Sequence, residues 1–152
     1  MFEQGKTYHR QTDLHERFGG NRQSGISPCA SYPYVFLFSS PRGEEFGYRD
    51  GWTSQNEYAY TGEGQSGDME MTRGNRAIME HEASGRELHL FEKVQSGFYE
   101  YIGQFRYRGH QLKHGPDGDG ASRMQIVFTL EPLTERLMSE HRGNEPATKE
   151  SG

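Results

Sequence analysis

The residues best suited to chemistry lie close together in the segment 47–77, which combines aromatic rings, carboxylates and glycines. Flat rings can stack on the faces of a planar base, and a carboxylate can accept a hydrogen bond from the amino group of cytosine. Glycines let the backbone approach such a ligand closely. The side chains that could take part are Tyr48, Asp50, Trp52, Tyr58, Tyr60, Thr61, Glu63 and Asp68. A β-turn with structural aromatics contains the same residue types, so residue types alone leave both interpretations open.

The order of the motifs in this segment resembles that of the SET- and RING-associated (SRA) domain family. The motifs are GYRDG from residue 47, YTGEGQSGDM from residue 60 and RGNRAI from residue 73, with SGI upstream at residue 24. This variant looks like the SRA-like domains of prokaryotic methylation-dependent HNH restriction endonucleases. The resemblance implies an α+β fold, namely a PUA-like curved β-barrel with two or three flanking helices. We expect this domain to span residues 1–133.

The resemblance also implies a binding pocket into which 5-methylcytosine is flipped out of duplex DNA. By motif position, Tyr48 and Tyr60 would hold the base between their rings, and Thr61 would lie beside them. An ungapped match puts the residue that recognises the base edge at Gly51. Because glycine has no side-chain acceptor, we assign recognition of the Watson–Crick edge of the base to Asp50 instead.

A second group of DNA-contacting residues is expected in the loop that precedes the first core strand. The resemblance places Gln23 where a residue enters the minor groove and fills the vacated stack, and its amide could bond to the orphaned guanine. The alternative is that Gln23 is simply an exposed loop residue. Asn21 and Arg22 could touch phosphate, and Ser24 completes the loop. Animal SRA domains carry a basic finger after their YTG segment, and this chain lacks that insertion, so discrimination of hemimethylated sites is not carried over.

Two other classes of function compete with a DNA-binding module. One is a nuclease or base-modifying enzyme in which Asp50, Glu63 and Asp68 hold Mg²⁺. The other is a domain that binds something other than DNA, favoured by the formal net charge of -5. His110 and His114 are four residues apart, but they lie in a region expected to be strand and loop rather than helix. We therefore predict a module without catalytic residues, metal or cofactor, whose partners are duplex DNA with a modified cytosine and a nuclease domain or protein.

Composition favours a small β-rich domain. The chain has 152 residues, which fits one domain, and only 31% of them are hydrophobic. The core must therefore rely on nine tyrosines, nine phenylalanines and one tryptophan, while 20 glycines indicate many turns. No apolar run reaches the roughly 18 residues that a membrane span needs. The single cysteine, Cys29, excludes an internal disulfide, so we expect a reducing cytoplasmic setting.

The pattern of apolar and turn-forming residues predicts five or six strands and two helices, arranged as a twisted or barrel-like sheet. The expected helices are 8–20, ended by Gly19 and Gly20, and 75–85, with His81 near the core. The expected strands are 32–40, 56–63, 87–94, 97–112 with a break at Gly103, and 123–133. Residues 114–122 are expected to form a loop, and 134–152 a polar tail that is partly disordered.

Overall fold

The computed structural model describes residues 2–40, 50–64 and 66–133, so the expected polar tail lies outside the described residues. The described residues form one eight-stranded sheet and two short helical segments. The first half contains β1 (Thr7–His9), the π-helical turn η1 (Arg10–His15) that continues into α1 (Glu16–Phe18), β2 (Ile26–Pro28) and β3 (Tyr34–Ser39). The second half contains β4 (Gly51–Ser54), β5 (Glu57–Thr61), α2 (Arg73–Met79), β6 (Glu87–Gln95), β7 (Phe98–Pro116) and β8 (Ser122–Pro132). No helix among these residues is long and apolar enough to cross a membrane.

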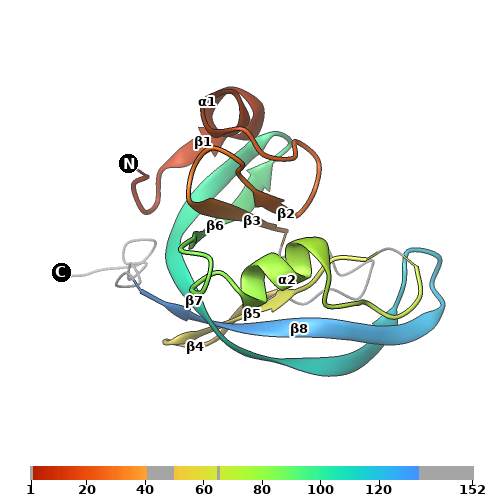
Figure 1. Ribbon diagram of the computed structural model, residues 1–152. Coiled ribbons are helices and arrows are strands. Elements are labelled where there is room, and N and C mark those ends of the chain that lie inside the picture. The colour runs from red at the N-terminus through yellow and green to blue at the C-terminus, as the bar shows by residue number, and fades with distance from the viewer. Residues whose placement is uncertain (1, 41–49, 65, 134–152) are drawn as a thin grey trace, which may run out of the picture.

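The strands follow the order β2-β3-β6-β7-β8-β5-β4, and β1 adds to β7. Neighbouring strands are antiparallel except β3 and β6, which run parallel with Tyr34 opposite Glu87. The sheet is strongly curved, and β7 bends around one side of the molecule from the N-terminal layer to the layer of β8, β5 and β4 (Figure 1). The expected barrel is not closed, because β2 and β4, the strands at the two ends of this order, do not pair with each other. Both are short, with three and four residues, and they leave a gap that side chains bridge.

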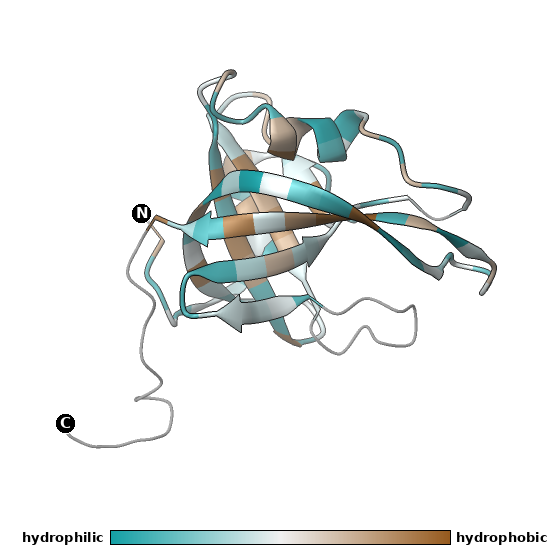
Figure 2. Ribbon diagram, turned by 90° about the horizontal axis from the view of Figure 1, so that it is seen from below, coloured by the Kyte–Doolittle hydropathy of each residue, from teal (hydrophilic) through white to brown (hydrophobic). Residues whose placement is uncertain are grey.

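Glycines allow the long strand β7 to bend. At Gly103 the backbone has a φ of 149°, and the pairing with β6 shifts register between Leu90 and Phe91. A second shift, against β8, lies between Tyr107 and Gly109. Such bulges increase the local bend and twist of a strand, which fits the predicted break at Gly103. Beyond the second bulge, β7 and β8 continue as a two-stranded arm that projects from the rest of the molecule (Figure 2).

Both faces of the central strands β3 and β6 are buried, so the molecule has two hydrophobic clusters. One face carries Val35, Leu37, Leu88 and Leu90 into the main cluster with β5, β7 and β8. The other face carries Phe36, Phe38 and Phe91 into a second cluster, together with Leu14, Cys29 and Tyr101. The ring of Phe2 packs against this second cluster and contacts seven other aromatic rings. Aromatic side chains thus supply much of the core, as the composition predicts.

Candidate functional site

A cavity of about 850 Å³ lies where the two ends of the curved sheet approach each other. Its walls are the loop 21–25 before β2, the end of β3, the start and end of the β4–β5 hairpin, and the connection 62–75 that leads into α2. Six of the eight predicted site residues line this cavity, namely Asn21, Gln23, Ser24, Asp50, Tyr60 and Thr61. Arg22 does not line it, and Tyr48 lies outside the described residues. Segments from distant parts of the chain therefore meet around one space.

Asp50 lies in the cavity wall, immediately before β4. Its Oδ1 accepts a hydrogen bond from the backbone N–H of Thr61 at 2.7 Å, and its Oδ2 accepts one from the hydroxyl of Ser39 at 3.2 Å. Burial raises the pKa of this carboxyl to about 6, although both hydrogen bonds act in the opposite direction. Each carboxylate oxygen has two lone pairs, so Asp50 can still accept a hydrogen bond from a ligand. Gly51, the other candidate for this role, is not among the residues that line the cavity.

Ser39 connects Asp50 to further polar groups behind the cavity wall. The hydroxyl of Tyr58, a fully buried residue, lies 3.1 Å from Ser39 Oγ and 2.6 Å from Glu92 Oε2. The negative charge of Glu92 also contributes to the raised pKa of Asp50. Because these groups are fixed in the core, the carboxylate of Asp50 is oriented before any ligand binds.

Tyr60 bridges the gap in the sheet. Its side chain is buried, with 2% of the residue exposed, and its hydroxyl lies 2.9 Å from the carbonyl oxygen of Gly25 and 3.0 Å from that of Phe38. Burial raises the pKa of the Tyr60 hydroxyl well above its usual value, so this group stays protonated and donates. Tyr60 therefore joins β5 to the loop before β2 and to the end of β3, and it also forms part of the cavity wall.

The loop 21–24 is held in shape by its own polar groups. Asn21 Oδ1 accepts hydrogen bonds from the backbone N–H groups of Gln23 and Ser24, each at 2.8 Å. Arg22 Nη1 donates to Gln11 Oε1 at 3.0 Å, and Gln11 Nε2 donates back to the carbonyl of Arg22 at 3.1 Å. Gln23 is exposed, and its side-chain amide makes no hydrogen bond with the described part of the chain. Asn21 and Arg22 thus shape the loop, whereas Gln23 is presented to solvent beside the cavity.

The connection 62–75 forms the remaining wall, and Asn75 holds it in place. This asparagine of the RGNRAI motif is 1% exposed, and its Oδ1 accepts from the backbone N–H of Glu63 at 2.8 Å. Its Nδ2 donates to the carbonyl oxygens of Glu63 and Glu70. The carboxylate of Glu63 accepts from the N–H of Gly74 at 2.9 Å, and a Cβ at position 74 would lie only 2.5 Å from that carboxylate oxygen. The motif residues Asn75 and Gly74 therefore have a structural role in shaping the cavity.

The three acidic residues considered as metal ligands all line the cavity, and each carboxylate is bonded to a different backbone amide. Asp50 bonds to the N–H of Thr61, Glu63 to that of Gly74, and Asp68 Oδ1 to that of Met124 at 2.8 Å. Within residues 2–40, 50–64 and 66–133, no group of three or more His, Cys, Asp or Glu side chains is arranged to hold a metal ion.

The curved sheet, with a polar cavity between its ends, has the architecture of an SRA-like domain, and the sequence identifies the family. The family model described as "ScoMcrA-like, SRA domain" matches residues 4–148, and the chain belongs to this family. No curated protein sequence matches the chain. The predicted SRA-like fold class is confirmed, apart from the closure of the barrel.

Solved structures give the same fold. The sulfur-binding and SRA domains of ScoMcrA, complexed with phosphorothioated DNA, are 28% identical with a TM-score of 0.70 over 87% of this chain and 40% of that chain. The type IV phosphorothioation-dependent restriction endonuclease ScoMcrA is 27% identical, with a TM-score of 0.71 over 90% of this chain and 29% of that chain. The SRA domain of SUVH5 in complex with fully methylated CG DNA, at 18% identity and a TM-score of 0.64, shares the fold over 90% of this chain and 92% of that chain. The chain thus spans less than half the length of the two ScoMcrA chains.

Proposed function

We propose that this chain binds duplex DNA that carries a 5-modified cytosine, by flipping the base into the cavity beside Asp50. The observation that carries this proposal is the buried, pre-oriented carboxylate of Asp50 in a cavity lined by aromatic, hydroxyl and glycine residues. A carboxylate there can accept a hydrogen bond from the N4 amino group of cytosine. Taking a base out of the stack costs a few kcal/mol, which stacking and hydrogen bonds in the cavity would offset. Membership of a family whose relatives include DNA complexes supports the proposal further.

We further propose that the domain serves as the targeting module of a modification-dependent restriction system in the cytoplasm. The similarity to part of the restriction endonuclease ScoMcrA supports this role. In this proposal the chain itself has no catalytic residues. A nuclease domain or a separate nuclease would supply the cleavage.

A binding panel of otherwise identical duplexes tests the proposed function. The panel contains unmodified cytosine, 5-methylcytosine, 5-hydroxymethylcytosine and, because of the ScoMcrA complex, a phosphorothioate linkage next to unmodified cytosine. We expect duplexes with a 5-modified cytosine to bind several-fold more tightly than the unmodified duplex. Equal affinity for all four duplexes would refute the proposal, and a preference for the phosphorothioate alone would replace the base with the backbone as the recognised feature.

A further inference from the structure

Arg10, at the start of η1, is a buried cation whose hydrogen bonds converge on the loop beside the cavity. The residue is 7% exposed, and its guanidinium carbon lies 3.8 Å from the centre of the Phe38 ring. Its Nη2 donates to the carbonyl oxygen of Asn21 at 3.0 Å and to that of Ser24 at 2.6 Å. These carbonyls belong to the first and last residues of the loop 21–24. One guanidinium group therefore holds both ends of the loop.

The remaining contacts of Arg10 fix the orientation of its side chain. Nε donates to Nε2 of His15 at 2.8 Å, and Nδ1 of His15 pairs with the carbonyl oxygen of Gly19 at 2.8 Å. Since a carbonyl only accepts, Nδ1 carries the proton and Nε2 is free to accept from Arg10. The aromatic face of Phe38 packs against the flat guanidinium. Arg10 is thus held from three directions before DNA is present.

Arg10 has no carboxylate partner in the part of the chain that the structure describes. Burying a cation without a counter-charge costs free energy, and the neutral acceptors around Arg10 compensate only part of that cost. If the only role of Arg10 were to fill space, a neutral side chain could do so at a lower free-energy cost. The fork-shaped donor group is needed because it reaches two carbonyls and an imidazole at once.

The loop that Arg10 holds presents Gln23. The backbone N–H groups of Gln23 and Ser24 are already satisfied by Asn21 Oδ1, while the Gln23 amide is exposed at the edge of the cavity. We propose that Arg10 is a positioning residue for DNA binding, which clamps the loop 21–24 so that Gln23 enters the duplex next to the flipped base. This inference rests on the proposed function, because it assigns Gln23 a role in DNA.

Two substitutions of Arg10 distinguish the effect of clamping the loop from the effect of the positive charge. Arg10→Lys keeps the positive charge but cannot bridge the two loop carbonyls and His15, whereas Arg10→Met removes both properties. We expect Arg10→Lys to lower the ratio of affinities for modified and unmodified duplex by about tenfold, while the salt dependence of weak non-specific binding stays that of the wild type. Arg10→Met should lose the same selectivity, and its salt dependence should also stay near that of the wild type, because a buried positioning residue neutralises no phosphate; a reduced salt dependence would show that Arg10 acts through its charge and would overturn the proposal. Arg17→Lys is the matched control, because Arg17 is exposed on the adjoining α1 and should leave both quantities unchanged.

A double-mutant cycle distinguishes positioning from general stabilisation. In a Gln23→Ala background, Arg10→Lys should change the selectivity ratio by less than about twofold, because the clamped residue is already missing. If Arg10→Lys costs the same selectivity in both backgrounds, Arg10 does not act through Gln23 and the proposal is overturned. A second variant, His15→Phe, removes the acceptor of Arg10 Nε, and it should reduce selectivity in the same direction. Wild-type selectivity in both Arg10→Lys and His15→Phe, when folded, would equally overturn the proposal.

Amide hydrogen exchange tests the clamp independently of DNA. In Arg10→Lys, the amides of Gln23 and Ser24 should exchange faster, while amides of the central strands β6 and β7 keep wild-type protection. Unchanged exchange in the loop would show that Arg10 does not hold it. If the wild-type protein binds every duplex equally, the proposed function fails and the DNA role of Arg10 fails with it, whereas the exchange rates still decide whether the clamp exists.

Discussion

In the proposed mode of binding, Asp50 is the residue whose protonation state bears most directly on recognition of the base. Its pKa is raised from 3.8 to about 6 by burial, so the carboxyl is mainly ionised at neutral pH and becomes neutral as the pH falls through 6. The ionised group only accepts hydrogen bonds, which suits the N4 amino group of cytosine and repels O4 of thymine. The neutral acid also carries a donor, which thymine O4 can accept. Recognition of cytosine over thymine should therefore depend on pH.

We expect the preference for 5-methylcytosine over a thymine in a thymine–guanine mismatch to be greatest above pH 6 and to decrease as the pH falls through that value. Asp50→Asn, whose amide can donate or accept, should show a weak preference at every pH. Competition binding with the two duplexes over a pH series measures this. Asp119→Asn, in the exposed turn at the tip of the β7–β8 arm, is the control. A pH-independent preference shared by the wild type and a folded Asp50→Asn variant would remove Asp50 from base recognition.

The same shift has a consequence for stability with a defined sign. Because the carboxyl of Asp50 has a higher pKa in the folded state than in the unfolded chain, ionisation favours unfolding. The contribution of Asp50 to the free energy of unfolding therefore decreases as the pH rises from about 4 to about 6. The Asp50→Asn variant lacks this pH-dependent contribution. As the pH rises from about 4 to about 6, the free energy of unfolding of the wild type should therefore fall relative to that of Asp50→Asn.

The ring and the hydroxyl of Tyr60 can be separated by substitution. Tyr60→Leu keeps apolar volume but removes the flat ring, so it should weaken binding of modified DNA by about 1–3 kcal/mol, the value of one base–aromatic stack. Tyr60→Phe keeps the ring and loses the hydroxyl bonds to Gly25 and Phe38, so it should lower the free energy of unfolding by about 1 kcal/mol and retain most of the binding. Calorimetric titration and denaturant unfolding measure the two effects. Wild-type affinity in folded Tyr60→Leu would mean that this ring does not stack on the base.

At the residue scale, the sequence predicted those site residues that belong to a recognisable motif. It did not predict residues whose role depends on how deeply the fold buries them. The motifs and their order pointed to Tyr60 and Thr61, and the need for a side-chain acceptor pointed to Asp50 rather than Gly51; these three residues lie together in the cavity wall. No sequence signal distinguished Arg10 from the exposed charges around it in a polar helical segment. Its burial depends on Phe38, which comes from the distant strand β3, and on backbone carbonyls of the loop 21–24, which no residue type marks in the sequence.

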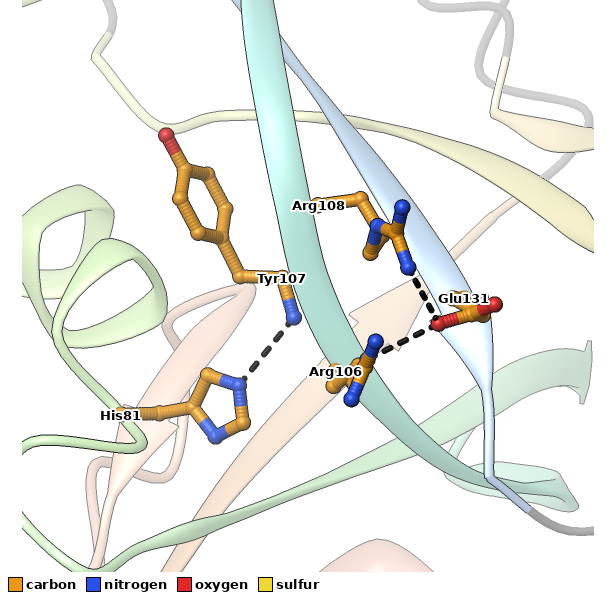
Figure 3. A network of polar contacts seen from close by, with 5 residues as sticks. All are labelled: His81, Arg106, Tyr107, Arg108 and Glu131. Atoms are coloured by element: carbon orange, nitrogen blue, oxygen red, sulfur yellow. Dashed lines mark hydrogen bonds and ion pairs between the residues drawn. The ribbon is translucent and has the colours of Figure 1, made fainter.

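At the scale of elements, His81 connects the turn that follows α2 to the second bulge of β7. His81 is 3% exposed, its Nδ1 pairs with the carbonyl of Arg86 at 2.9 Å, and its Nε2 accepts from the backbone N–H of Tyr107 at 3.1 Å. On the opposite face of β7, Arg106 and Arg108 both donate to Glu131 Oε1 of β8 (Figure 3). The N–H of Tyr107 thus finds its acceptor in a side chain at the place where the register of the ladder shifts. His81 lies in the core as predicted, with a more specific role than packing.

These two sets of contacts should contribute very differently to stability. His81→Leu leaves the partly buried N–H of Tyr107 without its acceptor, so we expect the free energy of unfolding to fall by about 1–3 kcal/mol. Glu131→Gln removes only a partly exposed pair of ion contacts, which are screened by solvent, so its effect on the free energy of unfolding should be smaller than that of His81→Leu. Urea unfolding of the two variants gives the comparison. A larger loss in Glu131→Gln than in His81→Leu would contradict this ranking.

The elements that the sequence did not predict are those that tertiary pairing creates. β1, β2 and β4 have three or four residues each, too few for an alternating pattern to be visible. β7 continues to Pro116 through residues whose local preference is for a loop, because the antiparallel ladder with β8 extends to the pair Pro116–Ser122. α2 begins at Arg73 and ends at Met79, earlier at both ends than the predicted 75–85. By contrast, β3, β5, β6 and β8 have apolar or alternating patterns that are visible in the sequence, and they lie within about two residues of their predicted bounds.

At the scale of the whole molecule, the proposal that the chain binds DNA without cleaving it can be tested directly. We expect the purified chain not to cleave duplex DNA with 5-methylcytosine in the presence of Mg²⁺ or Mn²⁺, because Asp50, Glu63 and Asp68 are each bonded to a different backbone amide. Gel analysis of end-labelled duplex after prolonged incubation is the measurement, with heat-denatured protein as the control. Metal-dependent cleavage that Asp68→Ala abolishes would favour the enzyme alternative.

The parallel pairing of β3 with β6 has a consequence for the order in which the molecule folds. Antiparallel neighbours such as β7 and β8 are joined by a short turn and can pair early, whereas a parallel pair requires a long crossover. Here the crossover runs from Ser39 to Glu87 and contains Asp50, all of β5 and the connection into α2. Closing so long a loop costs conformational entropy before the contacts between β3 and β6 form, so we expect this pairing to be a slow step of folding. The cavity is therefore completed only when the chain reaches its native topology. A partly folded chain would lack the proposed binding site, even if the β6–β7–β8 meander had already formed.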